Sequence, residues 1–139
     1  MLKKSIKYTD YNGVEREEEF LFHLTKAEIM EMEMTTTGGL TEMINQIVAA
    51  QDTASIIKLF KEVILKAYGE KSADGKRFIK VNDAGVPLSI GFSQTEAFYT
   101  LFMELATDED AAAKFMNGIV PADMVVSEEE INKIKQQNQ

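Results

Sequence analysis

The chain of 139 residues contains no cysteine, one histidine and no long apolar run. Without cysteine it can form no disulfide bond, no thiolate zinc site and no cysteine nucleophile. A membrane-spanning helix needs roughly 18 apolar residues, and no stretch approaches that length. The N-terminal lysines are also not followed by the apolar run of a signal peptide. We therefore expect a cytosolic protein that folds by burying one hydrophobic core.

Positive charge is scarce as well. Lysine and arginine total 15 against 23 aspartates and glutamates, which gives a formal net charge of −8. Nucleic-acid binding relies on clustered basic residues, so nucleic acid is a disfavoured partner. Acidic residues predominate over 15–33 and basic residues over 58–80. This asymmetry would favour head-to-tail association of copies, although two ordinary solvated faces account for it too.

The sequence also lacks a recognisable catalytic or metal-binding constellation. His23 has no second histidine or thiolate with which to share a metal, so a structural role is favoured. Asp108, Glu109 and Asp110 lie where a helix N-terminus favours negative charge, and capping accounts for them. There is no phosphate-binding glycine loop, calcium loop or nucleophile elbow. We expect a protein that is not an enzyme and uses no cofactor or metal.

An N-terminal β-hairpin is predicted from the Asn12-Gly13 turn between two apolar runs. A two-residue loop would place the apolar residues of the two strands on opposite faces. A three-residue loop over 11–13, with Gly13 left-handed, places Ile6 on the same face as Phe20 and Phe22. We therefore favour the three-residue loop.

Helical spacing of apolar residues continues through most of the remaining chain. The predicted helices span 25–34, 40–50, 53–68, 93–107 and 110–117. The helix over 53–68 has the clearest apolar face, which should form much of the core. Its expected core residues are Ile56, Ile57, Phe60, Val63, Ile64, Ala67 and Tyr68.

Local signals define the helix ends. Capping boxes are expected at Thr25 with Glu28 and at Ser93 with Glu96, and Thr107 or Asp108 should cap the last helix. Gly118 is predicted to end that helix in the left-handed conformation. Between the helices, the runs 77–81 and 86–90 predict a second small hairpin.

These elements predict an α+β fold that is mainly helical, with the N-terminal β-hairpin packed on a small bundle of four to six helices. We expect residues 1–121 to form a single globular domain. Residues 122–139 are polar and should form a flexible C-terminal tail.

Methionine is abundant for a chain of this length, with eight copies. Its side chain is flexible and polarisable, which suits surfaces that adapt to partners, although core packing also uses it. We predict a partner-binding set made of Met30, Met34, Met43, Phe102, Met103 and Met116.

Three blocks of sequence carry a family resemblance. They are YTDYNGVEREEEFLFHLTKAEIMEME over 8–33, YGEKSADGKRF over 68–78 and SQTEAFYTLFMELATDEDAAAKFMNGIVP over 93–121. In wording and order they resemble the tail assembly chaperones of long-tailed bacteriophages (siphophages) that infect Gram-positive hosts.

The resemblance implies a non-catalytic chaperone that binds the tape measure protein and keeps it soluble while the major tail (tube) protein polymerises around it. It also implies a frameshift-extended form of the chain, action in the host cell cytoplasm and absence from the mature virion. We expect a homo-oligomer with no membrane or nucleic-acid partner. The alternative is an acidic phage-encoded regulatory protein that sequesters a host protein by mimicking nucleic acid.

Overall fold

The computed structural model describes residues 1–35 and 53–121. The predicted helix over 40–50 and the predicted tail over 122–139 lie outside these ranges. The elements in chain order are β1 (Leu2–Thr9), β2 (Glu15–Phe22), α1 (Lys26–Thr35), α3 (Thr53–Ala67), β3 (Tyr68–Lys71), β4 (Phe78–Ile79), α4 (Leu88–Ser93), α5 (Glu96–Thr107) and α6 (Glu109–Ile119). An N-terminal hairpin followed mainly by helices confirms the α+β fold class.

The hairpin has the predicted three-residue loop. Ile6 lies opposite Glu18 in the ladder, and the Asp10 amide donates to the Val14 carbonyl over 2.9 Å. Gly13 has a φ of 79°, a left-handed conformation that glycine adopts without steric cost. The prediction that Ile6 and Phe22 share a face is therefore confirmed, and both side chains are buried.

The four strands form one antiparallel sheet in the order β1-β2-β3-β4. The pairing between β2 and β3 is short and consists of Leu21 with Gly69 and Phe22 with Tyr68. A Cβ atom on Gly69 would lie 2.5 Å from Cε1 of Phe78 and 2.8 Å from the Ile79 carbonyl oxygen. Glycine is thus needed here because β4 approaches the backbone closely.

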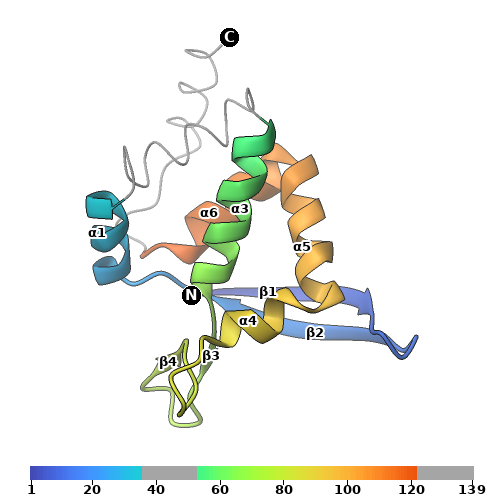
Figure 1. Cartoon of the computed structure of the whole chain (residues 1–139), viewed down its shortest axis with the longest axis horizontal. Coiled ribbons are helices and arrows are strands. Elements are labelled where there is room, and N and C mark those ends of the chain that lie inside the picture. Colours follow the sequence, from blue (N-terminus) through green and yellow to red (C-terminus); the bar gives the residue numbers. More distant parts are fainter. Residues whose placement is uncertain (36–52, 122–139) are drawn as a thin grey trace.

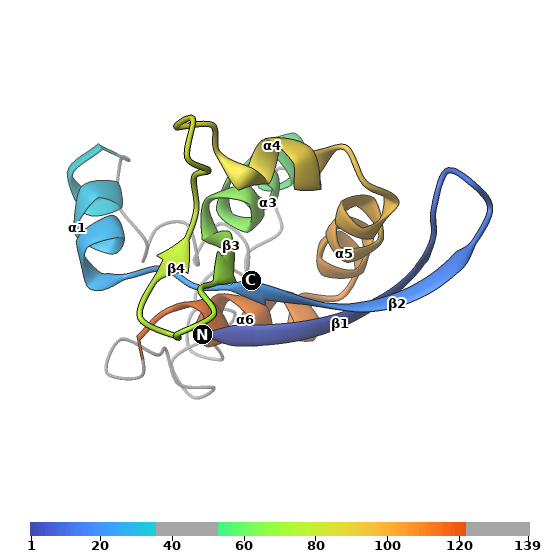
Figure 2. The same cartoon turned by 90° about the horizontal axis from the view of Figure 1, so that it is seen from below.

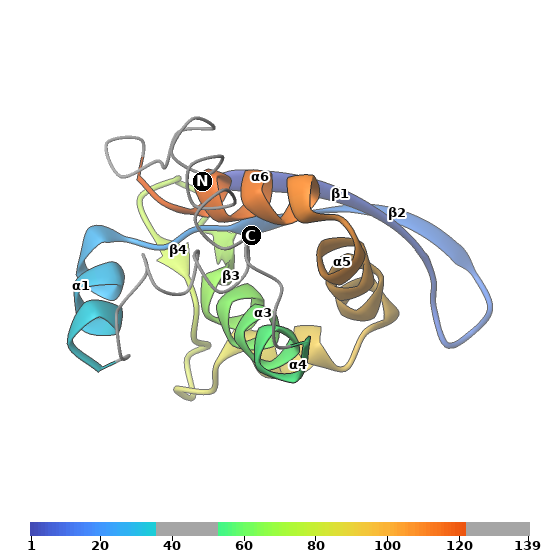
Figure 3. The same cartoon turned by 90° about the horizontal axis from the view of Figure 1, so that it is seen from above.

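The core lies between the hairpin and the helices. Figure 1 shows α3, α5 and α6 standing above the hairpin and α1 set apart at the opposite end from α5. Helix α4 packs against α3, α5 and β3. Figures 2 and 3 show the far end of the hairpin projecting beyond α5. The large fully buried side chains are Phe22, Phe98, Leu24, Ile29, Ile64, Leu101, Met116, Ile119 and Val63.

Aromatic rings form the centre of this core. Phe22 contacts Phe92 and Phe115 edge-on, with ring centroids 5.8 and 5.2 Å apart, and Phe92 stacks on Tyr68 at 4.2 Å. Each buried aromatic removes a large apolar area from water, and offset or edge-on pairs add further stability. The hairpin, α4 and α6 are therefore joined through one cluster.

The predicted core face of α3 is largely confirmed. Phe60, Val63, Ile64 and Ala67 are buried, whereas Ile57 is exposed and its prediction was wrong. Helical phase predicts the side of a helix on which a residue lies, but not how far along the helix the core extends.

Two predictions about local structure before α5 were wrong. Ser93 is not the cap of α5, because α4 continues through Ser93, whose hydroxyl donates to the Ile90 carbonyl over 2.7 Å. Thr95 is the cap, and its hydroxyl accepts from the Phe98 amide at 3.2 Å. The predicted strand over 86–90 is reduced to one bridge between Val81 and Pro87, after which the chain enters α4.

The end of α6 also differs from the prediction. Gly118 lies within α6 and is not left-handed; the helix continues to Ile119. A Cβ atom on Gly118 would lie 2.9 Å from Cδ1 of Leu2, so the glycine permits close packing of α6 near β1. Among the described residues, none of the helices has both the length and the apolar character needed to span a bilayer.

Candidate partner-binding surface

Helix α5 presents apolar side chains to solvent as well as to the core. Phe98, Leu101 and Leu105 recur at intervals of three and four residues and are buried. Tyr99 and Met103 are four residues apart on another face of the helix, where they are 48% and 56% exposed. The exposed pair is therefore a short apolar stripe that α5 does not use for its own packing.

The core supports this stripe from below. Phe98 contacts Tyr99 with ring centroids 5.3 Å apart, and it contacts the partly buried Phe102 at 6.2 Å. Because protein interiors are close-packed, a buried ring such as Phe98 restricts the movement of the residues that touch it. Tyr99 and Met103 consequently project from a rigid base.

The tip of the hairpin reaches the first turn of α5. Tyr11 is 73% exposed, and the pKa of its hydroxyl is raised, chiefly because that hydroxyl hydrogen-bonds to the Glu96 carboxylate. The Tyr11 hydroxyl therefore lies beside Glu96, in the first turn of α5. We define the α5 surface as Tyr11, Glu96, Tyr99, Phe102 and Met103.

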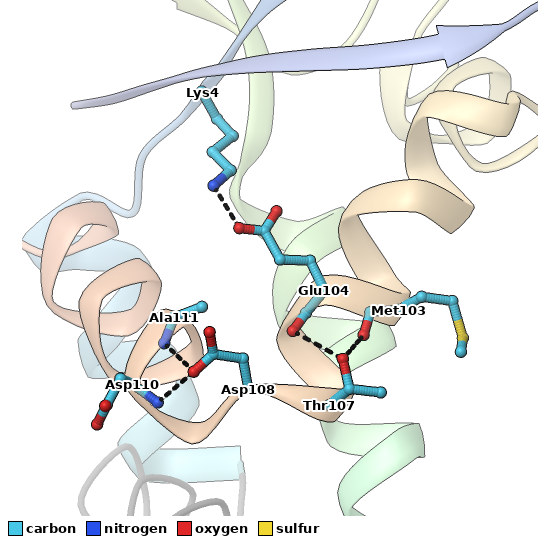
Figure 4. A network of polar contacts seen from close by, with 7 residues as sticks. All are labelled: Lys4, Met103, Glu104, Thr107, Asp108, Asp110 and Ala111. Atoms are coloured by element: carbon cyan, nitrogen blue, oxygen red, sulfur yellow. Dashed lines mark hydrogen bonds and ion pairs between the residues drawn. The ribbon is translucent and has the colours of Figure 1, made fainter.

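The corner between α5 and α6 fixes the far end of this surface. Figure 4 shows the Thr107 hydroxyl donating to the Met103 carbonyl over 2.7 Å and the Asp108 carboxylate accepting from the Asp110 and Ala111 amides. Of the two predicted caps, Thr107 and Asp108, the structure therefore has Asp108. The Met103 side chain points away from this corner in the same view.

The surroundings of the α5 surface are acidic. Residues 96–110 include Glu96, Glu104, Asp108, Glu109 and Asp110 but no lysine or arginine. Lys4 of β1 provides one nearby cation and pairs with the Glu104 carboxylate at 2.9 Å (Figure 4). A partner that binds here would meet an apolar stripe flanked by negative charge.

Met30, a second exposed methionine, lies on α1. Polar contacts of Glu28 with Thr25 and Lys80 hold this helix in place. Glu28 accepts from the Thr25 amide at 3.0 Å, which confirms the predicted capping box, and its other oxygen lies 2.5 Å from Nζ of Lys80. Burial raises the pKa of Glu28, but hydrogen bonds from Lys80 and Thr25 outweigh this, so the pKa lies below its usual value. Glu28 is thus ionised at neutral pH.

The predicted partner-binding residues do not form one surface. Phe102 and Met103 belong to the α5 surface, whereas Met30 on α1 is 64% exposed at the other end of the molecule (Figure 1). Met116 is buried, because it shares the inward face of α6 with Ala112, Phe115 and Ile119, and its packing serves the core. Met34 belongs to α1, but its side chain lies outside the described part of the structure, as does the whole of Met43.

Tyr99 and Tyr11 were absent from the predicted set. The sequence did contain a signal for Tyr99. Tyr99 lies four positions before Met103 and out of helical phase with the buried residues of α5, which marks a second apolar face. No local signal brings Tyr11 to α5, since that contact depends on how far the hairpin reaches.

Nδ1 of His23 is buried without a hydrogen-bond partner, and burial lowers the pKa of the ring, which favours the neutral form. Within 1–35 and 53–121, histidine, aspartate and glutamate side chains do not gather into a group of three that could hold a metal.

Comparison with protein families places the chain among known proteins. The model of a family described as phage tail assembly chaperone matches residues 1–139, the whole chain. Neither the comparison with curated proteins nor that with solved structures gives a match.

Proposed function

Because the chain belongs to the phage tail assembly chaperone family, we propose that it binds the tape measure protein through the α5 surface and keeps it soluble until the major tail protein polymerises around it. The chain acts as a chaperone without catalysis, in the host cytoplasm, and leaves before the virion is complete. A frameshift-extended form and further copies of the chain take part in the same assembly.

The observation that supports this proposal is the exposed Tyr99–Met103 stripe. The α5 surface combines a tyrosine, a second aromatic residue and a methionine, and aromatic residues and methionine are enriched in protein interfaces. A flexible thioether beside rigid rings allows contact with several apolar sequences, as a chaperone requires. The acidic surroundings favour client segments that carry lysine or arginine beside their apolar residues.

The proposal is tested by co-expressing the chain with tape measure protein and measuring the soluble yield of the latter. The test variant is the double substitution Tyr99→Ser with Met103→Gln, and the matched control is Met30→Gln, which changes an exposed methionine far from α5. Exposed substitutions usually change stability by no more than about 0.5 kcal/mol, so both variants should unfold at nearly the wild-type temperature.

We expect the double variant to lose most of the soluble tape measure protein and Met30→Gln to retain it. Loss with Met30→Gln alone would move the binding surface to α1. Full solubilisation by both variants would refute the proposed surface. Purification with a host protein in place of tail proteins would favour the regulatory alternative.

A further inference from the structure

Strand β2 is paired on both sides along only part of its length. It spans Glu15–Phe22, but β3 pairs with Leu21 and Phe22 alone. Among the described residues, no strand pairs with 15–20 on that side, although Glu70 and Lys71 of β3 line a depression together with residues 18–20. Figures 2 and 3 show this half of β2 in the projecting part of the hairpin.

The hydrogen-bond pattern between β1 and β2 shows which backbone groups of β2 face its open edge. The Asp10 amide bonds to the Val14 carbonyl, so even-numbered residues of β2 exchange hydrogen bonds with β1. On the other side, the His23 amide donates to the Ala67 carbonyl over 2.8 Å, so odd-numbered residues face β3. The amides and carbonyls of Glu15, Glu17 and Glu19 therefore point to the open edge.

The open edge leads into a depression where β3 ends. This depression has a volume of about 490 Å³ and is lined by residues 18–21 of β2, residues 68–71 of β3 and Lys3. It includes Gly69, which has no side chain, beside the partly buried Leu21 and Phe20. A chain that extends β3 along β2 would place a side chain in this depression.

Charge indicates which chain fits. The open half of β2 carries Glu15, Glu17, Glu18 and Glu19, all exposed, and Arg16 pairs with the Asp10 carboxylate at 2.6 Å. Glu17 accepts from the Ser5 hydroxyl at 3.3 Å and Glu18 accepts from the Tyr8 hydroxyl, and both glutamates keep their negative charge exposed. Charged edges protect a sheet from pairing with an edge of the same sign but not of the opposite sign. Two copies of this edge would oppose glutamate to glutamate, which disfavours symmetric pairing of the chain with itself.

We propose that the open half of β2, residues 15–20, is a strand-addition site for an extended segment of another protein that carries lysine or arginine at alternate positions. Backbone hydrogen bonds to Glu15, Glu17 and Glu19 hold the segment, and the glutamate side chains select its basic residues. The site is separate from the α5 surface and does not depend on the function proposed for that surface.

The test uses the full chain and a synthetic peptide of alternating threonine and lysine with blocked ends. Affinity is measured by calorimetry, and protection of the Glu15, Glu17 and Glu19 amides by hydrogen exchange. A second peptide is methylated on alternate backbone nitrogens, so that its charge is kept but its edge hydrogen bonds are lost.

Two matched variants separate the edges of the hairpin. Glu17→Pro removes an amide that faces the open edge, and Lys7→Pro removes the amide of the residue opposite it, which faces the other edge of the sheet. Thermal unfolding checks that both variants are folded. If Glu17→Pro fails to fold, the triple variant with Gln at 15, 17 and 19 tests the charges with the backbone intact.

We expect the parent peptide to bind wild type and Lys7→Pro equally and to protect the three amides. Binding should weaken about tenfold or more in Glu17→Pro, in the triple variant and with the methylated peptide. Equal binding of the methylated peptide would overturn the proposal by showing charge attraction alone. The proposal would also be overturned if the free chain self-associates and both proline variants abolish that self-association. In that case β1 of a second copy would occupy the open edge of β2.

Discussion

Helices α5 and α6 contribute alike to the core and differ on their outer faces. Each packs one face inward, through Phe98 and Leu105 in α5 and through Phe115 and Ile119 in α6. The outer face of α6 carries Glu109, Asp110 and Lys114, as expected for a solvated helix, whereas that of α5 carries Tyr99 and Met103.

The difference indicates that the apolar stripe of α5 is not a by-product of the fold. Folding of this domain needs one apolar face per helix, and α6 shows that the opposite face tolerates charge. Single exposed apolar residues are common and need no explanation. A tyrosine and a methionine one turn apart, beside Phe102 and the hairpin tip, form a more continuous surface, and this is why we assign partner binding to α5.

The largest predicted effect is on stability and concerns the inward, buried faces of α5 and α6. Phe98→Ala and Phe115→Ala should each lower the free energy of unfolding by about 3 to 5 kcal/mol, because each leaves a cavity in a close-packed core. Denaturant titration measures both losses. The comparison fails if Met103→Gln is equally destabilising, since Met103 would then be a core residue.

The caps of the two helices should have smaller effects. Thr95→Ala and Asp108→Ala each leave helix N-terminal amides without a side-chain acceptor, at a cost of about 0.5 to 2 kcal/mol. Asp108 should be the more costly of the two, because its carboxylate accepts from two amides and the Thr95 hydroxyl from one. The Thr95 hydroxyl also donates to the Phe92 carbonyl over 2.7 Å, and the reverse order in thermal unfolding would show that this bond contributes more than the second amide bond of Asp108.

The ion pair between Lys4 and Glu104 should contribute less again. Its side chains are 31% and 42% exposed, and pairs of this kind are worth about 0.2 to 1 kcal/mol. A double-mutant cycle with Lys4→Met and Glu104→Gln measures the coupling, which should fall as salt is added. Coupling that is unaffected by salt would indicate a more buried contact than the geometry shows.

The smallest predicted effect is at Gly118. Alanine is favoured over glycine in a helix by up to about 1 kcal/mol, but the added Cβ would lie 2.9 Å from the flexible side chain of Leu2. We expect Gly118→Ala to change stability by less than about 0.5 kcal/mol. A large loss of stability would mean that the Leu2 side chain cannot move aside. It would not restore the left-handed helix end predicted at Gly118, because Gly118 lies within α6.

Local patterns in the sequence predicted α5, α6, the register of the hairpin and the caps at Thr25 and Asp108. Each of these depends on residues close together in the chain. The cap of α5 was misplaced because Ser93 and Thr95 are both suitable, and burial of Phe92 in the core decides between them. Gly118 was misread because its reason is contact with Leu2, which lies more than a hundred residues away in the sequence.

The predicted partner-binding set stays a prediction, and the structure shows only where its residues lie. Residue type alone selected Met103 correctly as a surface residue but also selected Met116, whose helical phase with Phe115 and Ile119 places it in the core. Distance between elements was not available from the sequence, so Met30 and Met103 were grouped although they lie at opposite ends of the molecule (Figure 1).

The central claim, that partner binding uses the outward face of α5, is tested most directly by NMR of methionine methyl groups. The chain is labelled at its methionine methyls, and tape measure protein is added. The account predicts that the Met103 signal shifts or broadens, while the signals of Met30 on α1 and of buried Met116 stay in place. A response from Met30 with an unchanged Met103 signal would contradict the assignment of binding to α5.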